Sequence, residues 1–198
     1  ILDHICAAEN ISYWLTAGTL IGALRHGGMI PWDCDIDVGM TEADSQAFSH
    51  IAHKLPADIF FQTQSTDPTF PATRQIKLRD RYSSYYQWAL ANPDARWHHG
   101  LQLDIIMYPQ NNKGQLINPF RQTPYDRDEI FPLERIKFED AMLLAPRNPD
   151  HYIRRRYGDY TQLPPPEERI AHEGLADPFT PCDHPESRAY IKAKFRGG

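Results

Sequence analysis

The sequence predicts an α+β fold of mixed α/β type, in which one central sheet is flanked by helices. Segments with helical periodicity alternate with short segments of strict apolar–polar alternation through the first half of the chain, and several strands follow. The 198 residues are 41% hydrophobic and 24% charged, which is typical of a soluble globular protein. Folding at this length buries roughly 70% of the surface of the unfolded chain. We therefore expect a single domain with a substantial core over residues 1–198.

The first five elements follow from residue spacing. Residues 1–11 place apolar side chains at helical intervals, and residues 12–15 are short and aromatic, as in a strand. Residues 16–28 combine a turn of small residues with a short helix that ends at a Gly-Gly pair. Residues 33–40 alternate strictly, which predicts a strand. Residues 41–55 begin with a Thr cap and an acidic first turn and then continue as a helix.

The later elements are predicted in the same way. Three further segments have the composition of strands: residues 58–64, 72–80 and 101–108. Residues 81–90 fit either a strand or a helix. Past residue 109 the pattern loosens, although residues 135–146 predict a hairpin and residues 148–160 a helix with Pro just inside its start. From residue 162 the chain is rich in Pro and charge, so we expect it to wrap the surface with little regular structure.

Charge and cysteine content exclude several classes of protein. Lys and Arg number 21 against 26 Asp and Glu, a net charge of −5, which argues against a general nucleic-acid binder. The three cysteines are too few and too scattered for a disulfide framework or a Cys-rich zinc site. No run approaches the ~20 apolar residues of a membrane span. The chain begins with Ile rather than Met, which leaves open that it is a domain of a longer protein. Its compartment would be the cytoplasm if it is bacterial and the secretory-pathway lumen if it is a eukaryotic fragment.

Three aspartates stand at every second position of the predicted strand 33–40: Asp33, Asp35 and Asp37. Carboxylates at this short spacing repel one another, and burying them is costly unless a cation is bound. Asp35 and Asp37 are expected to lean toward one or two hard divalent cations, Mg²⁺ or Mn²⁺, and Asp104 of the segment 101–108 is expected to complete the cluster. The alternative is the solvated face of an edge strand, although Asp is a poor strand former.

A second feature lies just upstream. Ala17, Gly18 and Thr19 stand where a strand turns into a helix. A helix N-terminus with small residues exposes backbone N–H groups and a positive dipole end, which suits a phosphate. Small residues at such a turn also occur for packing alone, so this motif is weak by itself. Followed by an Asp-x-Asp strand, it predicts a site for a nucleoside polyphosphate and its metal.

The stretch "WLTAGTLIGALRHGGMIPWDCDIDVGM", residues 14–40, closely resembles the LicD family, which includes phosphocholine transferases and fukutin-related ribitol-phosphate transferases. The similarity returns in "FPLERIKFED", "APRNPDHYI" and "RYGDY". It also includes five positions of the tail: Leu163, Pro164, Pro165, Arg169 and His172. The resemblance implies a nucleotidyltransferase-like fold, with a core over about 1–110 and a C-terminal family extension over about 111–198.

The resemblance implies transfer of a phospho-alcohol from a CDP-activated donor to a glycan hydroxyl, with release of CMP. The superfamily signature falls on Ala17-Gly18-Thr19, with Thr19 where Ser is common, and on Asp35, Asp37 and Asp104. Asp35 and Asp37 would bind the metal that bridges the pyrophosphate, and Asp104 would complete its sphere or accept the proton of the attacking hydroxyl. Asp33 would orient a partner or serve as the base.

Phosphates also require cations. Lys77 and Arg79 alternate on one strand face and are the preferred pair for the pyrophosphate, although an exposed, charge-decorated strand explains them equally well. Arg25 follows the predicted phosphate-facing helix. Arginines 154–156 are expected mainly on a solvated helix face. The aromatic side chains at 85, 86 and 88 are expected in the core rather than stacked on a base or sugar.

Phosphocholine is the first expectation for the transferred group, with ribitol phosphate or another polyol phosphate as the rival within the family. A glycosyltransferase also uses Asp-x-Asp, but a nucleotide-binding β/α unit normally precedes that motif, and only about thirty residues do so here. A non-catalytic glycan- or nucleotide-binding domain is the third alternative. It predicts the loss of a carboxylate, whereas Asp35, Asp37 and Asp104 are all present.

Overall fold

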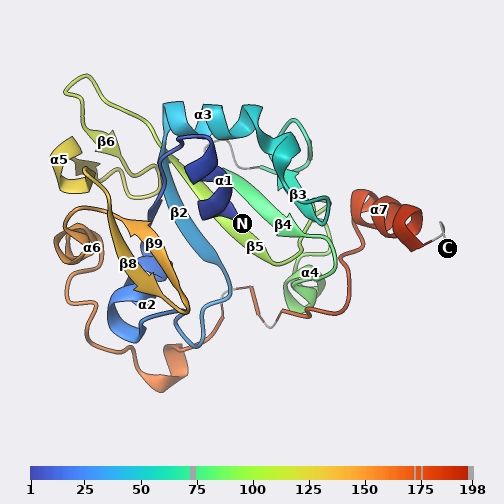
Figure 1. Cartoon of the computed structure of the whole chain (residues 1–198). Helices are drawn as coiled ribbons and strands as arrows, with labels where there is room; N and C mark the ends of the chain where they lie inside the picture. The colour runs from blue at the N-terminus through green and yellow to red at the C-terminus, as the bar shows by residue number, and fades with distance from the viewer. Residues whose placement is uncertain (72–74, 172, 175, 196–198) are drawn as a thin grey trace.

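The computed structural model describes residues 1–71, 75–171, 173–174 and 176–195. Its centre is a five-stranded sheet in the order β1 (Trp14–Leu15), β2 (Ile36–Thr41), β5 (Gln102–Tyr108), β4 (Gln75–Asp80) and β3 (Ile59–Gln62) (Figure 1). β2 and β5 run parallel, and the other neighbours are antiparallel. This mixed sheet with helices around it confirms the predicted fold class.

The helices of the first half begin and end at the expected signals. They are α1 (Leu2–Ala8), α2 (Ala17–His26), α3 (Glu42–His50) with the 3₁₀ turn η1 (Ala52–Lys54), and α4 (Tyr86–Ala91). α2 ends because Gly27 adopts a left-handed conformation with φ 73°. Thr41 caps the N-terminus of α3, because its side chain accepts a hydrogen bond from the backbone N–H of Asp44. α2 packs on β2, and α3 packs on β2 and β5.

The second half of the chain adds small elements around this core. They are β6 (Leu116–Ile117), β7 (Pro124–Tyr125), α5 (Arg127–Ile130), β8 (Glu134–Phe138), β9 (Ala141–Ala145), α6 (Pro149–Tyr157), η2 (Pro166–Glu168) and α7 (Pro185–Phe195). The β8–β9 hairpin contacts β1 and α2, and α6 contacts α2. The hairpin and α6 contribute Ala145, Tyr152 and Ile153 to the same hydrophobic cluster as the central sheet.

A fully buried indole joins the two halves. Trp14 of β1 is 0% exposed, and its Nε1–H donates to the hydroxyl of Tyr152 in α6 at 3.2 Å. That hydroxyl also lies 2.9 Å from Thr16 Oγ1 and 2.8 Å from the Tyr108 hydroxyl, so four buried polar groups satisfy one another. A Cβ on Gly39 would collide with the indole ring. Glycine at this position of β2 is therefore required for the close approach of Trp14.

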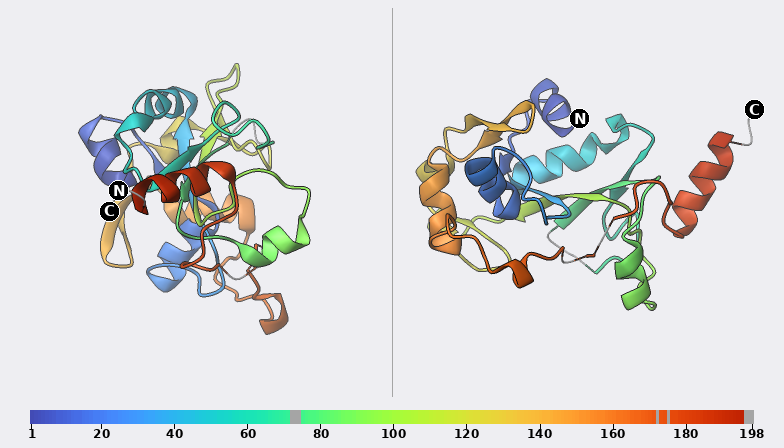
Figure 2. Two further views of the ribbon diagram at one scale, coloured as in Figure 1. Left: turned by 90° about the vertical axis from the view of Figure 1, so that its right-hand side faces the viewer. Right: turned by 90° about the horizontal axis from the view of Figure 1, so that it is seen from below.

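The structure corrects two predicted elements. β2 begins at Ile36 rather than at residue 33, because β5 offers its first parallel partner, Leu103, only there. The tail was expected to have little regular structure, but Pro185–Phe195 form α7, which stands clear of the sheet on the side of α4 (Figure 2). Arg81 binds α7 through an ion pair with Glu186, a tertiary contact that local composition does not reveal.

The remaining elements agree with the expectations. The ambiguous segment 81–90 contains α4, residues 135–146 form the β8–β9 hairpin, and α6 starts with Pro149. Residues 72–74 of the predicted strand 72–80, and His172 of the tail similarity, lie outside the described residues. None of the described helices is both long and apolar enough to cross a membrane.

Candidate active site

Three carboxylates from two neighbouring parallel strands meet at one point. Asp37 of β2 and Asp104 of β5 are register partners, and Asp35 lies directly before β2. One oxygen of each of these three side chains lies within 4.8 Å of those of the other two. We call Asp35, Asp37 and Asp104 the carboxylate cluster. The structure thus brings together the residues that the spacing of the sequence predicted.

The cluster carries more negative charge than its surroundings neutralise. Burial, with the charges of Asp35, Asp104 and Asp33, holds the pKa of Asp37 well above its usual value. Burial also raises the pKa of Asp104 to about 6, against the opposing effect of Lys77. Lys77 Nζ lies 2.8 and 2.7 Å from the two oxygens of Asp104. A single ammonium group therefore faces several closely spaced carboxylates.

This donor set fits a hard divalent cation. Carboxylate oxygens are the preferred ligands of Mg²⁺ and Mn²⁺, and a cation would relieve the repulsion that raises the pKa of Asp37. Asp35 also accepts a hydrogen bond from the Gln102 amide at 3.1 Å, which orients its carboxylate. A second group of ligand atoms, from Asp33, Cys34 and Asp35, lies beside the first. It adds a thiol whose pKa burial raises to about 12.

The start of α2 lies against the aspartates, as the sequence predicted. A Cβ on Gly18 would collide with the Asp33 carboxylate, so glycine at this position allows the Asp33 side chain to lie against the start of α2. The Thr19 hydroxyl accepts a hydrogen bond from the backbone N–H of Asp37 at 2.7 Å, and Thr19 is buried. Thr19 therefore positions the backbone of Asp37, whereas Gly18 lines the cavity into which the aspartates open.

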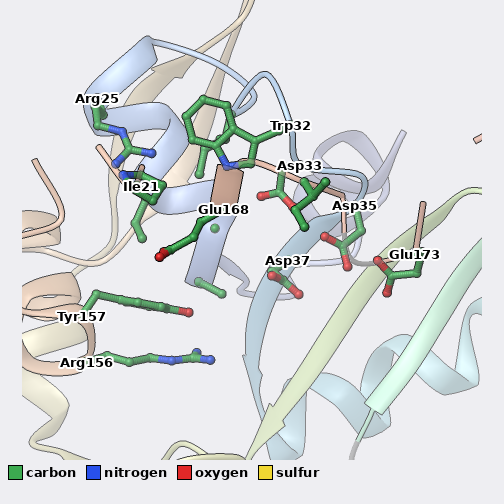
Figure 3. Close-up of a pocket in the computed structure, with 15 residues that line it drawn as sticks. Ile21, Arg25, Trp32, Asp33, Asp35, Asp37, Arg156, Tyr157, Glu168 and Glu173 are labelled. Atoms are coloured by element: carbon green, nitrogen blue, oxygen red, sulfur yellow. The ribbon is translucent and has the colours of Figure 1, made fainter. Parts of the chain in front are cut away.

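The aspartates open into a cavity of about 390 Å³, which we call the carboxylate pocket. Figure 3 shows Asp33, Asp35 and Asp37 on one side of it and Arg156 and Tyr157 extending toward Asp37 from α6. Nε and Nη1 of Arg156 are buried and have no hydrogen-bond partner among the described residues. The guanidinium lies 4.8 Å from the centre of the Tyr157 ring. An uncommitted guanidinium beside a carboxylate cluster is suited to an anion that reaches both.

The predicted phosphate-binding cations have other partners. Arg79 is 4% exposed, and its guanidinium donates to Gln62 at 2.8 Å and to the Gly100 carbonyl at 2.8 Å. Lys77 is held by Asp104 and Gln102. Arg25 lines the carboxylate pocket, and one of its nitrogens donates to the Tyr160 carbonyl at 2.7 Å. Of these three, only Arg25 lies on the wall of the carboxylate pocket.

The sequence analysis did not single out Arg156. At most two of residues 154–156 can face the same way, and a solvated helix face was the favoured interpretation for all three. Arg154 and Arg155 are indeed at the surface, in ion pairs with Asp150 and Glu129. Arg156 lies four positions after the buried Tyr152 and three after the buried Ile153, and therefore on the inward face of α6. That helical spacing was the signal in the sequence that distinguishes Arg156 from its neighbours.

The predicted aromatic core is found in part. Tyr85 is buried and its hydroxyl donates to the Cys34 carbonyl, whereas Tyr86 is exposed. Trp88 is half-buried and packs against Trp97.

The two histidines that are adjacent in the sequence, His98 and His99, have separate partners. His98 Nε2 lies 2.6 Å from Ser187 Oγ, and His99 Nε2 lies 3.3 Å from Asp183.

Comparisons with known proteins show the family to which the chain is similar. A family model described as the LicD/FKTN/FKRP nucleotidyltransferase domain matches residues 10–148. An uncharacterized Rickettsia typhi protein is 26% identical over 160 residues, 79% of this chain and 43% of that protein. The lipopolysaccharide cholinephosphotransferase LicD of Haemophilus influenzae is 48% identical over 65 residues, 31% of this chain and 22% of the relative. Human ribitol 5-phosphate transferase FKRP is 50% identical over 36 residues, 18% of this chain and 7% of the relative.

The chain thus spans less than half of the length of these three relatives. Among solved structures, the lincomycin-bound lincosamide antibiotic adenylyltransferase LnuA is similar with a TM-score of 0.46 and 12% identity, covering 84% of this chain and 88% of LnuA.

Proposed function

Because the chain belongs to the LicD/FKTN/FKRP family of nucleotidyltransferase domains, we propose that it transfers a phospho-alcohol from a CDP-activated donor to a glycan hydroxyl and releases CMP. The observation that carries the proposal is that Asp35 and Asp37 of the carboxylate cluster line the same open cavity as Arg156, whose Nε and Nη1 have no hydrogen-bond partner among the described residues. A diphosphate is the part of such a donor that uses a cation site and a free guanidinium together.

The residues have distinct tasks in this proposal. Asp35, Asp37 and Asp104 hold Mg²⁺ or Mn²⁺, which when bound neutralises the charge that develops on the diphosphate. Arg156 binds the diphosphate from the α6 side, and Gly18 leaves room for it at the start of α2. Lys77 and Gln102 keep the carboxylates in place through their bonds to Asp104 and Asp35.

In the transfer step, the oxygen of the glycan hydroxyl attacks the phosphorus that carries the alcohol. The bond from this phosphorus to the bridging oxygen breaks, CMP leaves with that oxygen and both electrons, and a phosphodiester forms. The hydroxyl proton passes to a carboxylate. We assign this role to Asp33, which lines the carboxylate pocket and lies outside the carboxylate cluster. Asp104 is the alternative base in a site where only Asp35 and Asp37 hold the metal.

Phosphocholine is the transferred group that we propose first, because 65 residues of the chain are 48% identical to a cholinephosphotransferase. The match to a ribitol 5-phosphate transferase is shorter, at 36 residues, and makes ribitol phosphate the second choice. A UDP-sugar donor would instead indicate the Asp-x-Asp glycosyltransferase class, and binding without turnover would indicate a non-catalytic domain.

The experiment is a donor panel. The protein is incubated with CDP-choline, CDP-ribitol and UDP-sugars in Mg²⁺, in Mn²⁺ or in EDTA, and CMP release and the shift of the unfolding midpoint are measured. We expect stabilisation and CMP release with one CDP-alcohol, both lost in EDTA and in Asp37→Asn. Asp140→Asn, in the exposed turn between β8 and β9, is the control and should behave as the wild type. Stabilisation by UDP-sugars alone would refute the proposal.

A further inference from the structure

A second cavity, of about 220 Å³, lies between β4, α4 and the segment that follows α4. We call it the aromatic pocket. Five aromatic or imidazole rings line it, those of Phe70, Tyr85, Trp88, Trp97 and His99. Trp88 and Trp97 have centroids 5.5 Å apart with planes inclined by 51°, and the His99 ring is 6.2 Å from that of Trp88. Its volume is below the roughly 300–1,000 Å³ of pockets that enclose a whole drug-sized ligand. It therefore fits one small ring rather than an entire donor.

The aromatic pocket adjoins the carboxylate cluster through shared side chains. Gln102 lines the pocket, and its amide nitrogen donates to Asp35 at 3.1 Å. The amide oxygen of Gln102 accepts a hydrogen bond from Lys77 Nζ at 3.0 Å, and Lys77 also binds Asp104. Glu173 lies on the walls of both cavities. A molecule in the aromatic pocket thus sits one side chain away from the cluster.

One buried polar atom on this wall has no protein partner among the described residues. His99 is 7% exposed, and its Nδ1 is buried without a hydrogen bond. Its other nitrogen, Nε2, lies 3.3 Å from Asp183, an acceptor that calls for a proton on Nε2. Burial lowers the pKa of His99, which favours the neutral ring. Nδ1 then carries a lone pair with no donor among the described residues, on a ring that lines the aromatic pocket.

We propose that the aromatic pocket binds one sugar ring of the acceptor glycan, an inference that rests on the proposed function. A sugar ring has apolar C–H faces, which the two indoles bury, and a rim of hydroxyls, one of which can donate to His99. A trimethylammonium group also fits an aromatic cage. It offers no hydrogen bonds, however, and would leave His99 Nδ1 unsatisfied.

The test measures binding of free monosaccharides directly. Glucose, galactose and N-acetylglucosamine are each added at millimolar concentration in EDTA, and saturation-transfer NMR records which of their ring protons contact the protein. We expect at least one sugar to give ring-proton signals that weaken about tenfold in Trp97→Ala. Trp88→Phe keeps an aromatic face and should lose less than Trp88→Ala. Leu90→Ala, an exposed position of α4, is the matched control and should bind as the wild type does.

The outcomes separate this inference from the proposed function. If no monosaccharide gives a signal, or if the signal survives in both Trp→Ala variants while unfolding curves show folded protein, the sugar site is refuted. Choline methyl signals that depend on Trp97 would also refute it, since the pocket would then hold the transferred alcohol. If sugars bind through Trp97 but no CDP-alcohol releases CMP, the proposed function fails and the sugar site stands.

Discussion

Replacing Asp37 by Asn is expected to stabilise the protein in the absence of metal. The substitution keeps the size of the side chain and the bond from its backbone N–H to Thr19. At a pH above the raised pKa of Asp37, it also removes one charge from the carboxylate cluster. Two charges 4.8 Å apart repel by about 3 kcal/mol at an effective dielectric constant of about 20. Lys77 and solvent offset part of this, so we expect a gain of about 2 kcal/mol. For a domain of this size the unfolding midpoint should rise by about 4–8 °C.

Divalent cations should reverse the order of the two proteins. At a Mg²⁺ concentration of 100 times Kd, the wild type gains about 2.7 kcal/mol, whereas the variant should gain little. The assay is thermal unfolding of wild type, Asp37→Asn and the control Asp140→Asn, each in EDTA and in a series of Mg²⁺ concentrations. A variant that is less stable than the wild type in EDTA, with an equal Mg²⁺ shift in both, would show that Asp37 does not face a cation.

Three further predictions concern other parts of the chain. Arg156→Met should weaken CDP binding in Mg²⁺ by roughly 10–100-fold, the loss of a charged hydrogen bond, in a thermal-shift titration where Arg154→Met binds normally. Burial lowers the pKa of His98 to about 2, so below pH ~6.5 the unfolded chain binds the extra proton and the wild type loses about 1.4 kcal/mol per pH unit through this group. Its stability advantage over His98→Gln in urea should shrink from pH 7 to pH 5, and a constant advantage would contradict the assignment. Gly39→Ala should cost about 1–3 kcal/mol because its Cβ displaces a fully buried indole, and an unchanged urea midpoint would contradict that packing.

The sequence was most informative where function depends on neighbouring positions in the chain. The alternation of aspartates fixed which face of β2 carries charge, and Asp104 occupies the equivalent position of the parallel strand β5. Helix boundaries followed from local caps, as at Thr41 and Gly27. These features depend on periodicity and on backbone hydrogen bonding within a few residues. Local sequence was therefore sufficient to predict them.

Features that depend on tertiary packing were not predicted. The alternation that suggested Lys77 and Arg79 as a pair was correct, but the partners of Arg79 are Gln62 and Gly100, on a neighbouring strand and a distant loop. Helical spacing places Arg156 on the inward face of α6, but which cavity that face meets depends on how α6 packs on α2. α7 is held by a contact of Glu186 with Arg81, more than a hundred residues earlier. Composition alone does not show which of several arginine side chains is buried in the folded protein.

The bonded hydroxyls around Trp14 have a practical consequence for choosing expression boundaries. The family match stops at residue 148, one residue before α6 begins. A protein truncated at that limit would lack Tyr152, so the indole nitrogen of Trp14 would be left without its acceptor at the centre of the molecule. It would lack Arg156 as well. A fragment cut to the homology limit should therefore be less stable than the whole chain, and it would lack the guanidinium that we propose for the diphosphate.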